Sequence, residues 1–128
     1  MTKAVLDENL AVLLARTLSD DELVVEPIPI GWRGLTNGRL ISCIEASHFS
    51  VFVSADRKLP HEQNISDSGI AFVIVSTNHL PTLVGQADQI RKLIKSAEAG
   101  RFAVMERDGT CFFVSVEQGK RTQKPIHL

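Results

Sequence analysis

The stretch Val51-Phe-Val-Ser-Ala-Asp-Arg-Lys-Leu-Pro-His-Glu-Gln-Asn64 combines a short apolar run with an abrupt polar end. Residues 51–55 are β-branched, aromatic or small, which is typical of a strand buried in a parallel sheet. Asp56 follows directly, then two cations and a Leu-Pro break, so Asp56 lies where a strand gives way to a loop. In open α/β sheets, ligands bind at this edge, outside the carboxyl ends of the strands.

A second strand with an acidic end occurs at the start of the chain, where Ala4-Val-Leu6 runs into Asp7 and Glu8. If the first and third strands are neighbours, Asp7 and Asp56 come together at one edge of the sheet, with Glu8 beside them. The sequence therefore predicts a shared acidic site.

The rest of the chain alternates between strand patterns and helix patterns. Strands are predicted at residues 3–7, 22–26, 51–55 and 70–75, with a hairpin formed by residues 102–106 and 111–116 around Asp108-Gly109. Helices are predicted at residues 9–18, from Thr36 or Asn37 with Leu40, Ile41 and Ile44 buried, as a short turn at 59–64, and from Leu83 to Ala97 with Gly100 as the C-cap residue.

This alternation predicts an α/β fold in three layers, with a mostly parallel central sheet covered on both faces and an antiparallel C-terminal hairpin. The length of 128 residues suits one domain. We expect residues 1–117 to form that domain and residues 118–128, which include Lys120, Arg121 and Lys124, to form a polar, flexible tail.

Composition restricts the function classes. The net charge of −1 predicts no strong general attraction to nucleic acid, so an anionic substrate needs a local patch or a metal. Cys43 and Cys111 have no CxxC spacing, and we expect two reduced, buried thiols. No apolar run of about 18 residues and no secretory leader pattern is present, so a soluble, cytoplasmic protein without a membrane partner is expected.

Two carboxylates held close together repel each other unless a proton or a cation lies between them. Mg²⁺ and Mn²⁺ take oxygen ligands, often one or two carboxylates with water and substrate phosphate. Such an ion can activate water and neutralise the charge that develops during phosphodiester cleavage. The alternative is that Asp7 and Asp56 cap the helices that follow them and are solvated.

Three stretches carry a resemblance to a known family. They are Leu6-Asp-Glu-Asn-Leu10, the loop Gly31-Trp-Arg-Gly-Leu-Thr-Asn-Gly38 with its following helix, and Val53-Ser-Ala-Asp-Arg-Lys-Leu-Pro-His-Glu-Gln-Asn64. In this order they resemble the motifs of small PIN-like proteins, which are often encoded as the toxin half of prokaryotic toxin–antitoxin pairs. The likeness spans about residues 3–95, and the Asp56 stretch is its most specific part.

The resemblance implies a PIN-like (Rossmann-like) three-layer fold and a ribonuclease that depends on Mg²⁺ or Mn²⁺. Carried over by position, Asp7 and Asp56 are the metal-binding and catalytic acids, and Glu8 is an adjacent catalytic candidate. Asn78 matches a more variable polar position after the fourth strand. The implied partners are RNA and an antitoxin protein, and a homodimer is also considered.

Arg39 departs from the family pattern, which commonly has an acid at this position, at the start of the second helix. A cation in the first turn of a helix opposes the helix dipole. One hypothesis is that Arg39 points to solvent and leaves a weakened site with two acids. The sharper hypothesis is that its guanidinium lies between Asp7 and Asp56 as a bidentate partner, where a metal would otherwise be.

Arg57 and Lys58 follow Asp56 directly, so with Arg39 and Asn78 they are the candidate substrate- or phosphate-binding residues; the alternative is that they are solvated. Two further functions remain open. One is a PIN-like protein with little or no catalysis that binds a partner or RNA. The other is a phosphoacceptor receiver domain, which has similar acids but also a lysine at the end of its fifth strand, absent from residues 102–106 here.

Overall fold

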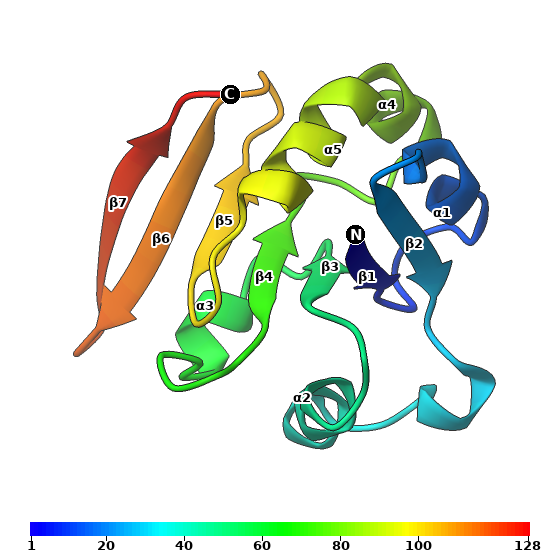
Figure 1. Cartoon of the computed structure of the whole chain (residues 1–128). Coiled ribbons are helices and arrows are strands. Elements are labelled where there is room, and N and C mark those ends of the chain that lie inside the picture. The colour runs from blue at the N-terminus through cyan, green and yellow to red at the C-terminus, as the bar shows by residue number, and fades with distance from the viewer.

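The computed structural model describes all 128 residues. Its centre is one seven-stranded sheet in the order β2-β1-β3-β4-β5-β6-β7 (Figure 1). The strands are β1 (Thr2–Leu6), β2 (Leu23–Pro27), β3 (Val51–Ser54), β4 (Ala71–Ile74), β5 (Phe102–Met105), β6 (Cys111–Glu117) and β7 (Lys120–Ile126). The helices are α1 (Leu13–Leu18), α2 (Asn37–Glu45), α3 (Leu59–Glu62), α4 (Leu80–Gly85) and α5 (Ala87–Ser96), with a 3₁₀ turn at Ile30–Trp32.

The first five strands are parallel to one another, and β6 and β7 are antiparallel additions. This confirms the α/β class, the mostly parallel sheet and the C-terminal hairpin. The order 2-1-3-4-5 is a common doubly wound arrangement, in which the chain switches direction between β1 and β3. The carboxyl ends of these two strands therefore flank the point where such sheets bind ligands.

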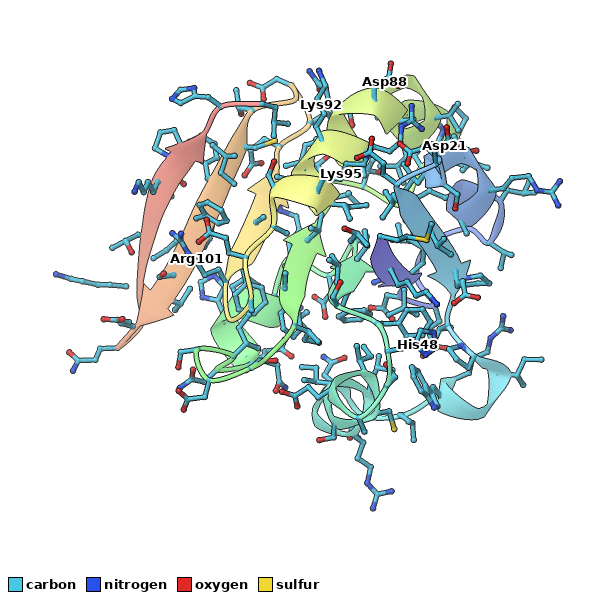
Figure 2. All side chains as sticks on the ribbon, in the orientation of Figure 1. Asp21, His48, Asp88, Lys92, Lys95 and Arg101 are labelled. Atoms are coloured by element: carbon cyan, nitrogen blue, oxygen red, sulfur yellow. The ribbon has the colours of Figure 1, made fainter.

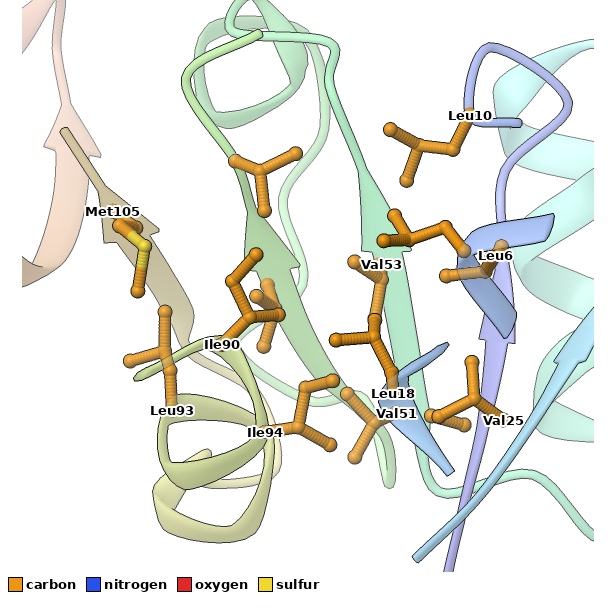
Figure 3. Close-up of a cluster of buried hydrophobic side chains, with 14 of the residues drawn as sticks. Leu6, Leu10, Leu18, Val25, Val51, Val53, Ile90, Leu93, Ile94 and Met105 are labelled. Atoms are coloured by element: carbon orange, nitrogen blue, oxygen red, sulfur yellow. The ribbon is translucent and has the colours of Figure 1, made fainter. Parts of the chain in front are cut away.

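The core lies in two layers because successive side chains of a strand point to opposite faces. On one face, Leu6 and Val53 pack with residues of α1, α4 and α5, including Leu18, Ile90 and Leu93 (Figure 3). On the other face, the core contains the strand residues Val5, Phe52 and Phe72 and the helix residues Leu40, Ile41, Ile44 and Leu59. Asp7, Ser54 and Asp56 continue the alternation of this second face, toward α2 and α3.

The single helix predicted from Leu83 to Ala97 is wrong, because the structure has two. Helix α4 starts earlier, at Leu80, and stops at Gly85, and the non-helical backbone of Gln86 separates it from α5. Ala97 is already extended, so Gly100 is not a C-cap residue. Gly100 instead occupies a left-handed turn before β5, at φ +76°, where an added Cβ would lie 2.8 Å from the backbone oxygen of Ser66.

The first helix begins four residues later in the structure than the predicted start at residue 9. The chain turns after Asp7, where the Leu10 amide bonds to the Asp7 carbonyl, and α1 begins only at Leu13. The side chain of Asn9 explains the difference, because it bonds to Ser54 and to the Ala55 amide. These contacts hold the segment against β3 and keep it out of the helix.

The tail predicted beyond residue 117 is also different in the structure, because Lys120–Ile126 forms β7. Its side chains are almost all exposed, and it pairs with β6 along the full length of both strands. A strand that buries no apolar face has no alternation in sequence to reveal it. The backbone ladder with β6 is what defines it.

Charged side chains cover the outer face of α5, where Lys92 and Lys95 are labelled (Figure 2). Lys95 pairs with Asp20 at 2.9 Å, in the loop before β2. Cys43 and Cys111 are free thiols, in α2 and β6. None of the helices is long and apolar enough to cross a membrane.

Candidate functional site

The hydroxyl group of Ser54 contacts both the Asp7 carboxylate and the backbone amide of Asp56. The Ser54 Oγ donates a 2.7 Å hydrogen bond to Asp7 Oδ2 and accepts a 3.0 Å bond from the Asp56 amide. The Asp7 amide in turn bonds to the Val53 carbonyl at 2.8 Å, which fixes the end of β1 against β3. The parallel sheet thus brings together the two acids predicted from sequence.

Asn9 locks the two loops of the site together. Its Nδ2 donates to Ser54 Oγ at 3.2 Å, and its Oδ1 accepts from the Ala55 amide at 3.2 Å. Neither Asn9 nor Ser54 was singled out from sequence. A signal for Ser54 was available, because residues 54 and 56 of an extended segment point to the same side.

Asp7 is a buried acid, with only 8% of the residue exposed to solvent. Burial raises the pKa of Asp7 above its ordinary value, and the charges of Glu8 and Asp56 raise it further. Hydrogen bonds from the Ser54 hydroxyl and the Glu8 amide act against this rise in pKa. The charge of Asp56 makes the smallest of these contributions to the pKa of Asp7.

Glu8 does not complete a three-acid cluster. Its side chain is exposed and accepts a 3.1 Å bond from the Gly34 amide, in the loop that leads to α2. No group of three or more His, Cys, Asp or Glu side chains is close enough to hold a metal ion. The candidate site therefore contains two acids, Asp7 and Asp56.

The hypothesis that Arg39 bridges Asp7 and Asp56 is wrong. Arg39 is exposed in the first turn of α2 and forms no ion pair within 4.0 Å. Its long side chain keeps full hydration in solvent, whereas a position between the acids would require desolvation of the guanidinium. The charge of the two acids is not neutralised by this residue.

The other predicted substrate-binding residues are not gathered around Asp7. Arg57 turns to the end of β5, where its Nη2 donates to both oxygens of Glu106, at 3.2 and 2.9 Å. Lys58 is exposed, and its amide bonds to Asp56 Oδ1 at 3.0 Å. Asn78 is exposed after β4 and has no side-chain hydrogen bond.

Two hydroxyl groups follow β4. Thr77 Oγ1 accepts a 3.1 Å bond from the His79 amide, which is a local turn contact. The Ser76 Oγ is buried and has no hydrogen-bond partner. By strand alternation Ser76 belongs to the same face as Asp7 and Ser54, beyond Ile74, which pairs with Ser54.

Asp7 and Asp56 supply carboxylate oxygens, which are the ligand type that Mg²⁺ and Mn²⁺ prefer. These ions are commonly held by one or two carboxylates and keep several waters, so a full cage of protein ligands is not required. The pKa of Asp7 is raised mainly by burial, and the charges of Glu8 and Asp56 add to this rise to a smaller extent.

No family model, curated protein or solved structure matches this chain.

Proposed function

We propose that this chain is a PIN-like ribonuclease that cleaves RNA phosphodiester bonds with Mg²⁺ or Mn²⁺. The observation that carries the proposal is the placement of Asp7 and Asp56 at the switch point between β1 and β3, where one Ser54 hydroxyl bonds to the Asp7 carboxylate and to the Asp56 backbone amide. Two acids in this position, with no cation paired to either of them, are suited to bind a divalent ion.

In this proposal Asp7 and Asp56 hold the ion. When bound, the ion supplies Lewis-acid activation of water and of the phosphate. Ser54 holds the Asp7 carboxylate through Oδ2, and Asn9 keeps the two loops in register. Glu8 remains the adjacent catalytic candidate, and its carboxylate also positions the loop before α2 by accepting the Gly34 amide.

The test is cleavage of a fluorescent single-stranded RNA in Mn²⁺ or Mg²⁺. Asp7→Ala and Asp56→Ala are each expected to lower the rate by at least about 100-fold, as is typical when a group that stabilises developing charge is lost. Asp67→Ala is the matched control, because Asp67 is an exposed acid with no side-chain hydrogen bond or ion pair. Activity that survives both site substitutions rejects the proposal.

A second candidate is a PIN-like protein that binds RNA or a partner with little catalysis. It is favoured by Arg39 at the position of the family's acid and by the bond that holds Glu8 at Gly34. Binding of RNA by the wild type without cleavage, in saturating Mn²⁺, would select this candidate.

A third candidate is a phosphoacceptor domain, because receivers share the strand order 2-1-3-4-5. The end of β5 is unfavourable for it. Glu106 stands there and pairs with Arg57 and Arg121, and no lysine is present. Labelling of Asp56 by acetyl phosphate would favour the receiver function.

By the same proposal, the chain acts in the cytoplasm as the toxin of a toxin–antitoxin pair, with RNA as substrate and an antitoxin protein as partner. Induced expression of the wild type is then expected to arrest growth, and Asp7→Ala to remove the arrest. A growth arrest that persists in Asp7→Ala argues against nuclease toxicity. Sedimentation of the purified chain tests whether it also forms a homodimer.

A further inference from the structure

Three residues from distant parts of the sequence meet at the end of β5, and one of them, Arg57, directly follows Asp56. Glu106, at the end of β5, accepts hydrogen bonds from Arg57 Nη2 at 2.9 and 3.2 Å. Arg121, in β7, lies 3.6 Å from Glu106 through its Nη2. The last strand of the chain is thus connected to the residue that directly follows Asp56.

The charges in this group do not balance. Two guanidinium groups share one carboxylate, which leaves one positive charge in excess. Each guanidinium has five N–H donors, and Glu106 takes donors from only one nitrogen of Arg57. The remaining N–H groups of Arg57 and Arg121 have no protein partner and are free to bind an anion.

A small cavity lies next to these donors. Its rim includes Arg57, Arg121 and His61, and its wall includes the apolar side chains of Ile74, Val104 and Val114. The volume is about 20 Å³, which is enough for one water-sized atom. An apolar wall lowers the local dielectric constant and strengthens the attraction between the guanidinium groups and an oxyanion. The cavity is therefore of a size to receive one oxygen of a larger anion.

We infer that Arg57, Arg121 and His61 form a binding site for a backbone phosphate of a nucleic acid strand. This inference rests on the proposed function and adds to it. Arg57 adjoins Asp56, so a strand whose scissile phosphate is at Asp7 and Asp56 places a neighbouring phosphate at the arginines. Glu106 is the positioning residue that holds the two guanidinium groups side by side. The local positive charge accounts for how a chain of net charge −1 attracts a polyanion.

Binding can be tested separately from cleavage. The affinity of wild-type protein for a fluorescent single-stranded RNA is measured by anisotropy in EDTA, over a series of salt concentrations. Arg57→Ala and Arg121→Ala are each expected to weaken binding about tenfold, the loss expected for a charge-assisted hydrogen bond. Each is also expected to lower the slope of log affinity against log salt by about 0.7, the value for one phosphate contact on a single strand.

Lys124→Ala is the matched control. Lys124 is an exposed cation of the same strand that forms no ion pair, and it pairs with Phe113, on the other face of the sheet from Arg121. It is expected to change affinity by less than about twofold. Equal losses in Arg121→Ala and Lys124→Ala would mean that only overall charge matters, and would overturn the site.

The variant Glu106→Gln tests whether Arg57, Arg121 and Glu106 form a phosphate-binding site or only an ion network that stabilises the fold. Glutamine keeps an oxygen that can accept a hydrogen bond from Arg57 but carries no charge. The guanidinium groups are then held in place without an opposing charge, so RNA binding is expected to tighten by a few-fold. If the three residues only stabilise the hairpin, RNA binding is unchanged in Glu106→Gln and in both arginine variants, and the inference is rejected. Thermal unfolding of each variant checks that β7 stays folded.

The two proposals fail in different ways. Loss of cleavage in Asp7→Ala with unchanged binding in EDTA supports both. Binding that depends on Arg57 and Arg121 without any cleavage by the wild type removes the nuclease and keeps the phosphate site. Cleavage by the wild type that is unaffected by Arg121→Ala, with unchanged affinity, removes the phosphate site and keeps the nuclease.

Discussion

Ser54 is the last residue of β3, Asp7 directly follows the neighbouring parallel strand β1, and their side chains, 47 residues apart in sequence, are joined by a 2.7 Å hydrogen bond. Ser54 is 1% exposed and Asp7 is 8% exposed, so the bond is shielded from water. The same hydroxyl accepts the Asp56 amide, which makes Ser54 the group through which the two acids are positioned.

Ser54→Ala is expected to lower the free energy of unfolding at neutral pH by about 1.5–3 kcal/mol, because a buried carboxylate loses a charge-assisted hydrogen bond. The backbone amide of Asp56 and the side-chain Nδ2 of Asn9 also lose the Ser54 Oγ as their acceptor. Urea unfolding measures the change. Ser115→Ala is the control, since Ser115 is an exposed strand serine without a side-chain hydrogen bond. Equal stability of the two variants would contradict this role of Ser54.

Asp7→Asn is expected to raise the stability at neutral pH. The pKa of Asp7 is raised on folding, chiefly by burial, so the folded state holds this proton more tightly than the unfolded state. The wild type therefore loses stability as pH rises from the ordinary pKa of 3.8 through the raised pKa. The advantage of Asp7→Asn should be full above that window and disappear at about pH 3. A constant difference at all pH values would argue against a raised pKa.

Mg²⁺ or Mn²⁺ is expected to stabilise the wild type against thermal unfolding, by about 2.7 kcal/mol at 100 times the dissociation constant. Asp56→Ala should remove this effect, and Asp67→Ala should keep it. Arg39→Ala should also keep the wild-type affinity, because the guanidinium is exposed and forms no ion pair. Much tighter binding by Arg39→Ala would show that Arg39 competes with the ion.

Gly100→Ala is expected to destabilise the fold more than Gly119→Ala. Both glycines have a left-handed backbone, at φ +76° and +77°, so both substitutions cost about 1–2 kcal/mol of backbone strain. At Gly100 the new Cβ also meets the Ser66 carbonyl oxygen at 2.8 Å, whereas nothing lies within 4 Å at Gly119. Thermal or urea unfolding of the two variants isolates the cost of the clash, which we expect to be about 1–3 kcal/mol. Equal losses would show that the 65–66 segment moves away freely.

The local sequence pattern was sufficient to predict the parallel strands and the buried face of α2. Apolar runs such as residues 70–75, and the spacing of Leu40, Ile41 and Ile44, follow directly from which side chains are buried. The pattern was not sufficient for the break at Gln86. A helix interrupted for one residue keeps nearly the same apolar spacing on both sides, so α4 and α5 look continuous in sequence. Strand β7 left no pattern because it has almost no buried side chain.

The apolar runs before Asp7 and Asp56 were enough to predict that each acid lies just beyond the carboxyl end of a strand. The groups that surround the two acids could not be predicted in this way. The order of strands in the sheet and the directions of side chains depend on packing between segments that are far apart in the chain. This packing places the Ser54 hydroxyl against Asp7 and the Glu8 carboxylate at the Gly34 amide. It also leaves Arg39 in solvent and pairs Arg57 with Glu106.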